Sequence, residues 1–174
     1  MRGLRLIPWI ALALGACTIR RAEPPRSGGP ADGEAAVRAE LERYYADFTA
    51  RNWVAFADHF WGGATITTMW QPPGTARPIV DAQTVPSFVA KAPEGPGSKP
   101  IFEERMTQAD IRVHRDLAHA WVRYEARFGD PGNLLTWRGI DAITLIRHQG
   151  RWRITSLAFT DQDGEVTDRG ATSR

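Results

Sequence analysis

The sequence predicts an α+β domain in which helices come first and an antiparallel sheet follows. Early in the chain, apolar residues recur at the three- and four-residue spacing of a helix. From residue 102 onward, four runs have the composition and length of strands. The connections between these runs are short, which makes neighbouring strands antiparallel. Helices followed by an antiparallel meander are typical of the α+β class.

The first helix is predicted from a set of residues that share one face, Val37, Leu41, Tyr44 and Phe48. Asn52 is a suitable N-cap for a second, shorter helix. The residues that this second segment would bury are Trp53, Phe56, Ala57 and Phe60.

A strand is predicted next over residues 62–70, GGATITTMW, entered through its glycines. Residues 71–78, QPPGTARP, have the composition of a turn-rich connection. Thr84 is positioned to cap a third short helix that carries Val85, Phe88 and Val89, and Pro86 is tolerated in its first turn. Residues 91–100 predict a loop.

Four strands are expected at residues 102–114, 118–128, 136–148 and 151–161, joined by residues 115–117, 129–135 and 149–150. Strand 118–128 separates into two faces by alternation. One face is mostly apolar: Ala120, Val122, Tyr124, Ala126 and Phe128. The other is mostly polar and also carries an aromatic: His119, Trp121, Arg123, Glu125 and Arg127. This second face is a solvated surface, a dimer contact or a pocket wall.

The opening segment has the layout of an export signal. Arg2 and Arg5 precede an apolar run, and Leu14-Gly15-Ala16 leads to Cys17, the single cysteine of the chain. The apolar run is too short to cross a bilayer as a helix. A lone thiol in such a segment has no partners for catalysis or metal binding. An ordinary secretory peptide that happens to contain a cysteine is the alternative to a modified cysteine.

Leu14-Gly15-Ala16-Cys17 resembles the lipobox of bacterial lipoproteins. The resemblance implies that residues 1–16 are removed and that Cys17 carries a diacylglycerol. In double-membraned bacteria an Asp after the cysteine tends to retain a lipoprotein at the inner membrane. Thr18 follows here, which favours the outer membrane, with the protein facing the periplasm in the cell envelope.

Residues 17–33 are rich in Pro, Gly and charge, which predicts a flexible tether. Residues 34–162 form one domain, and residues 163–174 form a disordered tail. The whole chain has 22 basic and 20 acidic residues, and two of the basic ones lie in the predicted signal. A balanced charge without a basic stripe argues against nucleic-acid binding.

Residues 34–161 resemble the nuclear transport factor two-like superfamily, also called the SnoaL-like or ketosteroid-isomerase-like fold. The segments that carry the resemblance are YYADFTARNWVAFADHF, GGATI, the short helix around Phe88, and IDAITLIRHQGRWRITSLAF. The resemblance implies a strongly curved sheet wrapped round a long helix, with a pocket at the open end of the resulting cone. It also implies frequent dimerisation through the outer face of the sheet.

The isomerases of that superfamily use a tyrosine on the first helix and a protonated aspartic acid on the penultimate strand. The resemblance places these on Tyr44 and Asp141. The superfamily's general-base aspartate falls on Thr68, which cannot accept a proton from carbon, so isomerase activity is in doubt. Asp141 and Tyr44 are alternatively core residues whose polar atoms bond to each other or to a tryptophan nitrogen. Candidate pocket-lining residues are Phe48, Phe56, His59, Phe60, Trp61, Thr68 and Trp137.

Three functions follow as expectations. The first is a lipid-anchored envelope protein, non-enzymatic, that binds a small apolar molecule in its cone. The second is a cofactor-free isomerase, cyclase or dehydratase that uses Tyr44 and Asp141, with Asp58, His59, His114 or His119 as substitute bases. The third is an envelope interaction or dimerisation module. Scattered histidines and the absence of a phosphate-binding loop predict neither a metal site nor a cofactor.

Overall fold

The computed structural model describes residues 30–70 and 76–163. The predicted signal, residues 1–16, most of the predicted tether and Cys17 lie outside the described residues, as does the tail from residue 164. The described chain is α+β, as predicted, with the element order α1 (Pro30–Thr49), α2 (Trp53–Asp58), β1 (Phe60–Trp70), β2 (Ile79–Thr84), α3 (Val85–Lys91), β3 (Ile101–His114), β4 (Leu117–Asp130), β5 (Asn133–His148) and β6 (Arg151–Asp163).

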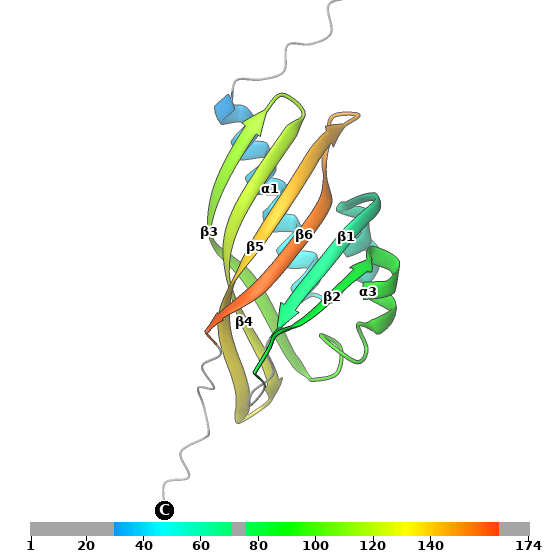
Figure 1. Cartoon of the computed structure of the whole chain (residues 1–174), viewed down its shortest axis with the longest axis vertical. Helices are drawn as coiled ribbons and strands as arrows, with labels where there is room; N and C mark the ends of the chain where they lie inside the picture. The colour runs from blue at the N-terminus through cyan, green and yellow to red at the C-terminus, as the bar shows by residue number, and fades with distance from the viewer. Residues whose placement is uncertain (1–29, 71–75, 164–174) are drawn as a thin grey trace, which may run out of the picture.

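The strands form one six-stranded sheet in the order β2-β1-β6-β5-β4-β3. Strands β3 to β6 are a continuous antiparallel meander, which confirms the prediction from their short connections. Strand β1 lies parallel to β6, so the first strand of the sequence sits beside the last. The sheet curves around α1, and α3 lies beside the β1–β2 end (Figure 1).

Two of the predicted helix caps are confirmed. The side chain of Asn52 accepts a hydrogen bond from the Ala55 backbone N–H at the start of α2. The Thr84 hydroxyl accepts one from Ser87 N–H at the start of α3, where Pro86 occupies the first turn. The sequence is sufficient to predict these two helix starts, because an N-cap side chain bonds to a backbone N–H within three residues of itself.

Three predicted boundaries were wrong. Helix α1 begins at Pro30, inside the segment predicted as tether, and a Cβ atom at Gly33 would lie 3.0 Å from the Val113 side chain of β3. Strand β2 was missed, because its alternating pattern is mostly exposed at the sheet edge. Residues 129–135 were expected as a loop, but the register pairs Asp130 with Asn133. Only Pro131 and Gly132 form the turn, and Gly132 has the positive φ of +82° that favours glycine there.

The core lies between α1 and the concave face of the sheet. The predicted apolar faces are the ones buried, including Val37, Leu41, Val122 and Tyr124. On the opposite face of β4, Glu125 pairs with Arg105 of β3 and Arg138 of β5, and Trp121 is 49% exposed. The convex face of β4 therefore carries ion pairs and an exposed tryptophan. Among the described helices, none combines the length and the hydropathy that a bilayer span requires.

Candidate functional site

A buried phenol and a buried carboxyl meet on the concave face of the sheet. The Tyr45 hydroxyl of α1 donates a hydrogen bond to Asp141 Oδ2 of β5. Tyr45 is 3% exposed and Asp141 2% exposed. The expectation of a phenol next to Asp141 is met, but by Tyr45 and not by Tyr44, the residue that the resemblance indicated.

Tyr44 points into an aromatic cluster beside this pair. Its ring lies 5.0 Å from that of Tyr45, edge to face, and 5.6 Å from that of Phe56. Phe48 and Phe60 complete the same cluster at 6.1 and 5.9 Å from Tyr44. Adjacent rings in edge-to-face and tilted arrangements fill space efficiently. Tyr44 therefore supports the position of Tyr45, and its ring separates the Tyr45–Asp141 pair from α2.

A second carboxyl, Glu104 of β3, belongs to the same interior. The register pairs Glu104 with Ala126 and Ala126 with Trp137, so all three share the concave face with Asp141. The Thr49 hydroxyl holds the Glu104 backbone by donating to its carbonyl at 2.7 Å and accepting from its N–H at 2.8 Å. The last residue of α1 thus fixes the strand position from which Glu104 projects.

The electrostatics of the two carboxyls are coupled. Burial raises the pKa of Asp141 to about 7, although the hydrogen bond from Tyr45 acts in the opposite direction. Burial, and then the charge of Asp141, raises the pKa of Glu104 well above its ordinary range. Burial and the charges of Asp141 and Glu104 also raise the pKa of both Tyr44 and Tyr45. Near neutral pH, the interior therefore holds carboxyl groups that keep or share protons.

Tyr124 completes one wall of this interior. It stands opposite Gly139 on the neighbouring strand, and a Cβ atom at position 139 would overlap the Tyr124 ring and the Thr160 carbonyl. Gly139 is therefore required by a close approach of side chain to backbone. Several apolar residues packed against the core are only half-buried: Phe88, Val89, Met106, Phe128, Trp137 and Phe159.

The remaining candidate lining residues separate into two groups. Phe48, Phe56 and Phe60 are buried in the aromatic cluster. Thr68 of β1 is half-buried and pairs with Phe159 of β6, which in turn pairs with Asp141 of β5. Thr68 and Asp141 therefore lie on the same side of the sheet, two strands apart. By contrast, Trp61 is 41% exposed and packs its ring against His148 at 4.9 Å, outside the concave face.

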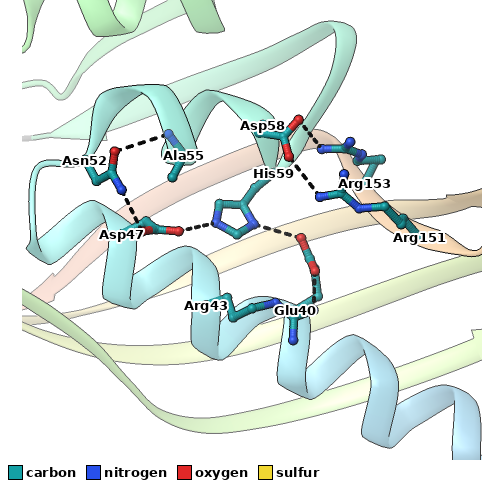
Figure 2. Close-up of polar contacts among 9 residues, drawn as sticks. All are labelled: Glu40, Arg43, Asp47, Asn52, Ala55, Asp58, His59, Arg151 and Arg153. Carbon is teal, nitrogen blue, oxygen red and sulfur yellow. Dashed lines mark hydrogen bonds and ion pairs between the residues drawn. The ribbon is translucent and has the colours of Figure 1, made fainter.

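His59 also lies elsewhere, although it is buried. Its Nδ1 is 2.7 Å from Glu40 Oε1 and its Nε2 is 2.9 Å from Asp47 Oδ2, on the stripe of α1 that faces α2 (Figure 2). Both ring nitrogens are therefore engaged by carboxylates. His114 and His119 are exposed, and Asp58 pairs with Arg151 and Arg153, so none of these candidate bases reaches the Tyr45–Asp141 pair.

Sequence reasoning missed Tyr45 and Glu104, and both had a signal. Val37, Leu41, Tyr45 and Phe48 have helical spacing as regular as that of the set containing Tyr44. In FEERM, alternation places Glu104 on the same face as Phe102 and Met106. The helical spacing fits Tyr44 and Tyr45 equally well, so it does not select between them. The alternation in FEERM identifies Glu104 only once the buried face of the strand is known.

The arrangement is suited to holding a polar atom in apolar surroundings. A neutral Asp141 can donate a hydrogen bond to a carbonyl or to a developing oxyanion. Whichever of the two carboxyls ionises is, with its raised pKa, a competent proton acceptor near neutral pH. The described residues at this site offer oxygen atoms only, in one phenol and two carboxyls.

Comparison with known proteins assigns the fold. No family model matches the chain, and no curated protein matches it in sequence. Many solved structures match in shape, among them NTF2-like (nuclear transport factor 2-like) proteins. An NTF2-like protein of unknown function from Shewanella baltica has a TM-score of 0.56 and 13% identity over 79% of this chain and 99% of its own. The predicted fold is thereby confirmed.

Two further neighbours show what this fold accommodates. An NTF2-like protein with a cystatin-like fold from Novosphingobium aromaticivorans has a TM-score of 0.59 and 14% identity, over 83% of this chain and 91% of its own. The hexachlorocyclohexane dehydrochlorinase LinA-type3 from Novosphingobium barchaimii has a TM-score of 0.58 and 12% identity, over 78% and 90%. At these identities the likeness concerns the fold alone.

Proposed function

We propose that this NTF2-like domain binds a small, mostly apolar molecule on the concave face of its sheet. Tyr45, Asp141 and Glu104 would hold the polar atoms of that molecule. The observation that carries the proposal is the placement of a buried carboxyl, a buried phenol and a second, half-buried carboxyl on one mostly apolar face of the sheet. Burying carboxyls costs free energy that folding alone does not recover, and such groups are characteristic of binding and catalytic sites.

The surroundings of these groups support an apolar ligand. Phe88 and Val89 of α3, Met106 of β3 and Trp137 of β5 are half-buried and pack against the core. Ligand sites are generally lined by apolar and aromatic side chains with a few placed polar groups. The ligand would complete the burial of these side chains.

An enzymatic role is the second candidate, and Glu104 favours it. The objection to catalysis is that the expected base position holds Thr68. Glu104 supplies a carboxylate on the same concave face, coupled to Asp141. One of the two carboxyls, while it keeps its proton, would stabilise an oxyanion, and the other, once ionised, would accept a proton, as an isomerase, cyclase or dehydratase requires. A dehydrochlorinase on this fold adds only analogy, because one fold hosts many functions.

Thermal shift with panels of steroids, polyketides and fatty acids, followed by native mass spectrometry of any complex, tests the binding proposal. We expect a stabilising ligand whose effect is lost in Asp141→Asn and Glu104→Gln. Glu103→Gln is the matched control, because Glu103 lies on the opposite face of the same strand and pairs with Arg127. A ligand effect that is equal in all three variants would place the molecule elsewhere, and no effect from any compound would refute binding of these classes.

Catalysis is separated from binding by turnover measurements on the ligand that the screen identifies. The enzymatic candidate requires product formation by the wild type, with a rate that Glu104→Gln lowers by more than its weaker binding explains. If the ligand is unchanged after prolonged incubation with the full chain, catalysis is refuted for that ligand and binding is the only role that remains.

We also propose that the mature protein is tethered to the envelope through an acylated Cys17. Support comes from the export-signal layout and from the coincidence of the cysteine with the small-residue cleavage site. A domain held at a membrane surface is well placed to receive apolar molecules that partition there.

A further inference from the structure

A separate pocket of about 580 Å³ lies on the other side of α1 from the Tyr45–Asp141 pair. Three segments enclose it: α1, α2, and the turn between β5 and β6 with the start of β6. The lining residues are Ala36, Ala39, Glu40, Arg43, Asp47, Ala55, Asp58, His59, Gly150, Arg151 and Trp152. Its volume is within the range of small-molecule sites.

The acidic groups of this pocket are already engaged. Glu40 contacts His59 at 2.7 Å and Arg43 at 2.5 Å, and Asp47 contacts His59 at 2.9 Å (Figure 2). A neutral imidazole can donate from one nitrogen only. A histidine that contacts carboxylates through both nitrogens is therefore satisfied as the imidazolium. Asp58 is likewise shared by Arg151 at 2.8 Å and Arg153 at 3.0 Å.

Hydrogen-bond donors, by contrast, are in surplus. The side chains of Arg43 and Arg151 are 61% and 57% exposed, and each uses only part of its five-donor guanidinium on its carboxylate. Trp152 lines the pocket and is 4% exposed, yet its indole N–H has no acceptor among the described residues. The nitrogen itself is enclosed by the protein, so Trp152 serves as a reporter of the pocket wall and the two arginines supply the accessible donors.

We infer that this pocket binds a small organic anion, with a carboxylate or phosphate group held by the exposed guanidinium groups of Arg43 and Arg151. Ala36, Ala39 and Ala55 provide a small apolar wall for the body of the ligand. The ligand group that binds here must offer hydrogen-bond acceptors and no donors, because the carboxylates of the pocket are already paired with its arginines and with His59. Planar guanidinium groups match the geometry of carboxylate and phosphate oxygens.

The test titrates the ¹⁵N-labelled full chain with benzoate, phenyl phosphate and inorganic phosphate, with benzylamine as the cationic counterpart of benzoate. The readout is the Trp152 indole N–H resonance, identified by its loss in Trp152→Phe. We expect a saturable shift with at least one anion and none with benzylamine. A stronger effect of benzoate identifies a carboxylate site, and a stronger effect of either phosphate identifies a phosphate site.

Three variants locate the site. Arg43→Gln and Arg151→Gln should each weaken binding about tenfold or more, as expected for a charge-assisted hydrogen bond. Ala36→Leu, at an exposed helix position that lines the pocket, should block binding by filling the space. Arg105→Gln is the control, because Arg105 is also exposed and ion-paired but lies on the convex face. Tyr45→Phe should leave anion binding unchanged, which separates this site from the concave one.

Two results would overturn the inference. One is the absence of any saturable shift up to millimolar anion. The other is a shift that Arg43→Gln, Arg151→Gln and Ala36→Leu leave as it is in the wild type.

Discussion

The hydroxyl of Tyr45 donates to the carboxyl of Asp141 across the interior, joining the first helix to the fifth strand over 96 positions of sequence. Both residues are buried, so neither group has water as a substitute partner. This bond ties α1 to the sheet at the same point where the candidate site is formed. Stability and site geometry are consequently linked through one interaction.

Tyr45→Phe should lower the free energy of unfolding by about 1–3 kcal/mol, because it leaves a buried carboxyl without its donor. Tyr44→Phe is the control, because it makes the same chemical change one residue earlier and leaves the bond to Asp141 intact. We expect it to cost less than Tyr45→Phe. Urea unfolding at pH 6 measures both. Equal losses would show that the bond to Asp141 is not what stabilises this region.

The contribution of Asp141 to stability should fall as pH rises from about 4 to about 7. The pKa of Asp141 is raised from 3.8 to about 7 in the folded protein. The folded state therefore keeps a proton that the unfolded state releases, and it loses this advantage as pH passes through the folded pKa. A shift of this size corresponds to at most about 4 kcal/mol.

Urea unfolding at several pH values between 4 and 8 checks this dependence, and Asp141→Asn should flatten it. The exposed Asp110, whose nearest basic partner lies 3.8 Å away, provides the control variant Asp110→Asn. A slope unchanged in Asp141→Asn would contradict a buried, protonated Asp141.

His59 should contribute stability that is present below about pH 6.5 and disappears at higher pH. Burial lowers the pKa of His59, but the hydrogen bonds and charges of Glu40 and Asp47 outweigh burial and raise it overall. A raised pKa means that the folded state favours the protonated form, so the contribution is lost as pH rises through the folded pKa. His59→Gln should cost about 1–3 kcal/mol at pH 6, because the buried Glu40 loses one of its two cationic partners and keeps only Arg43, and less at pH 9.

His119→Gln is the matched control for this measurement, since His119 is exposed on the convex face. It should change neither the stability nor its pH dependence. If His59→Gln were equally destabilising at pH 6 and pH 9, the role of His59 would be packing and not charge.

Gly139→Ala should destabilise the protein by about 2–4 kcal/mol or prevent folding, because the new methyl group overlaps the Tyr124 ring and the Thr160 carbonyl. Gly62→Ala is the control. No atom lies within 4 Å of a Cβ built at that position, which is exposed, so its effect should be small. Thermal unfolding compares the two, and a stable Gly139→Ala variant would show that Tyr124 moves aside easily.

Cys17→Ser should release the protein from membranes. In a double-membraned bacterium, we expect the wild type to enter the detergent phase of a Triton X-114 separation and to carry acyl mass on Cys17. Cys17→Ser should enter the aqueous phase. Mass spectrometry that finds an unmodified Cys17 in the mature wild-type chain would contradict the anchor.

The sequence by itself determined the helix periodicity, the caps at Asn52 and Thr84, and the antiparallel meander from residue 101 to residue 163. These features depend on residues within a few positions of one another, so local spacing is sufficient. The resemblance that the sequence carries also indicated Asp141 as a buried acid, in agreement with its apolar neighbours on the strand, Ile140 and Ala142.

Only the tertiary structure decided which tyrosine meets Asp141. Successive residues of a helix are rotated by about 100°, so Tyr44 and Tyr45 both lie within one broad apolar face. The curvature of the sheet and the angle of α1 select Tyr45 for the carboxyl and Tyr44 for the aromatic cluster. The same curvature brings Glu104 near Asp141, although the two residues lie on strands separated by β4. His59 instead contacts Glu40 and Asp47, on the stripe of α1 that faces α2. No spacing within the chain encodes these distances, because they arise from how separate elements pack.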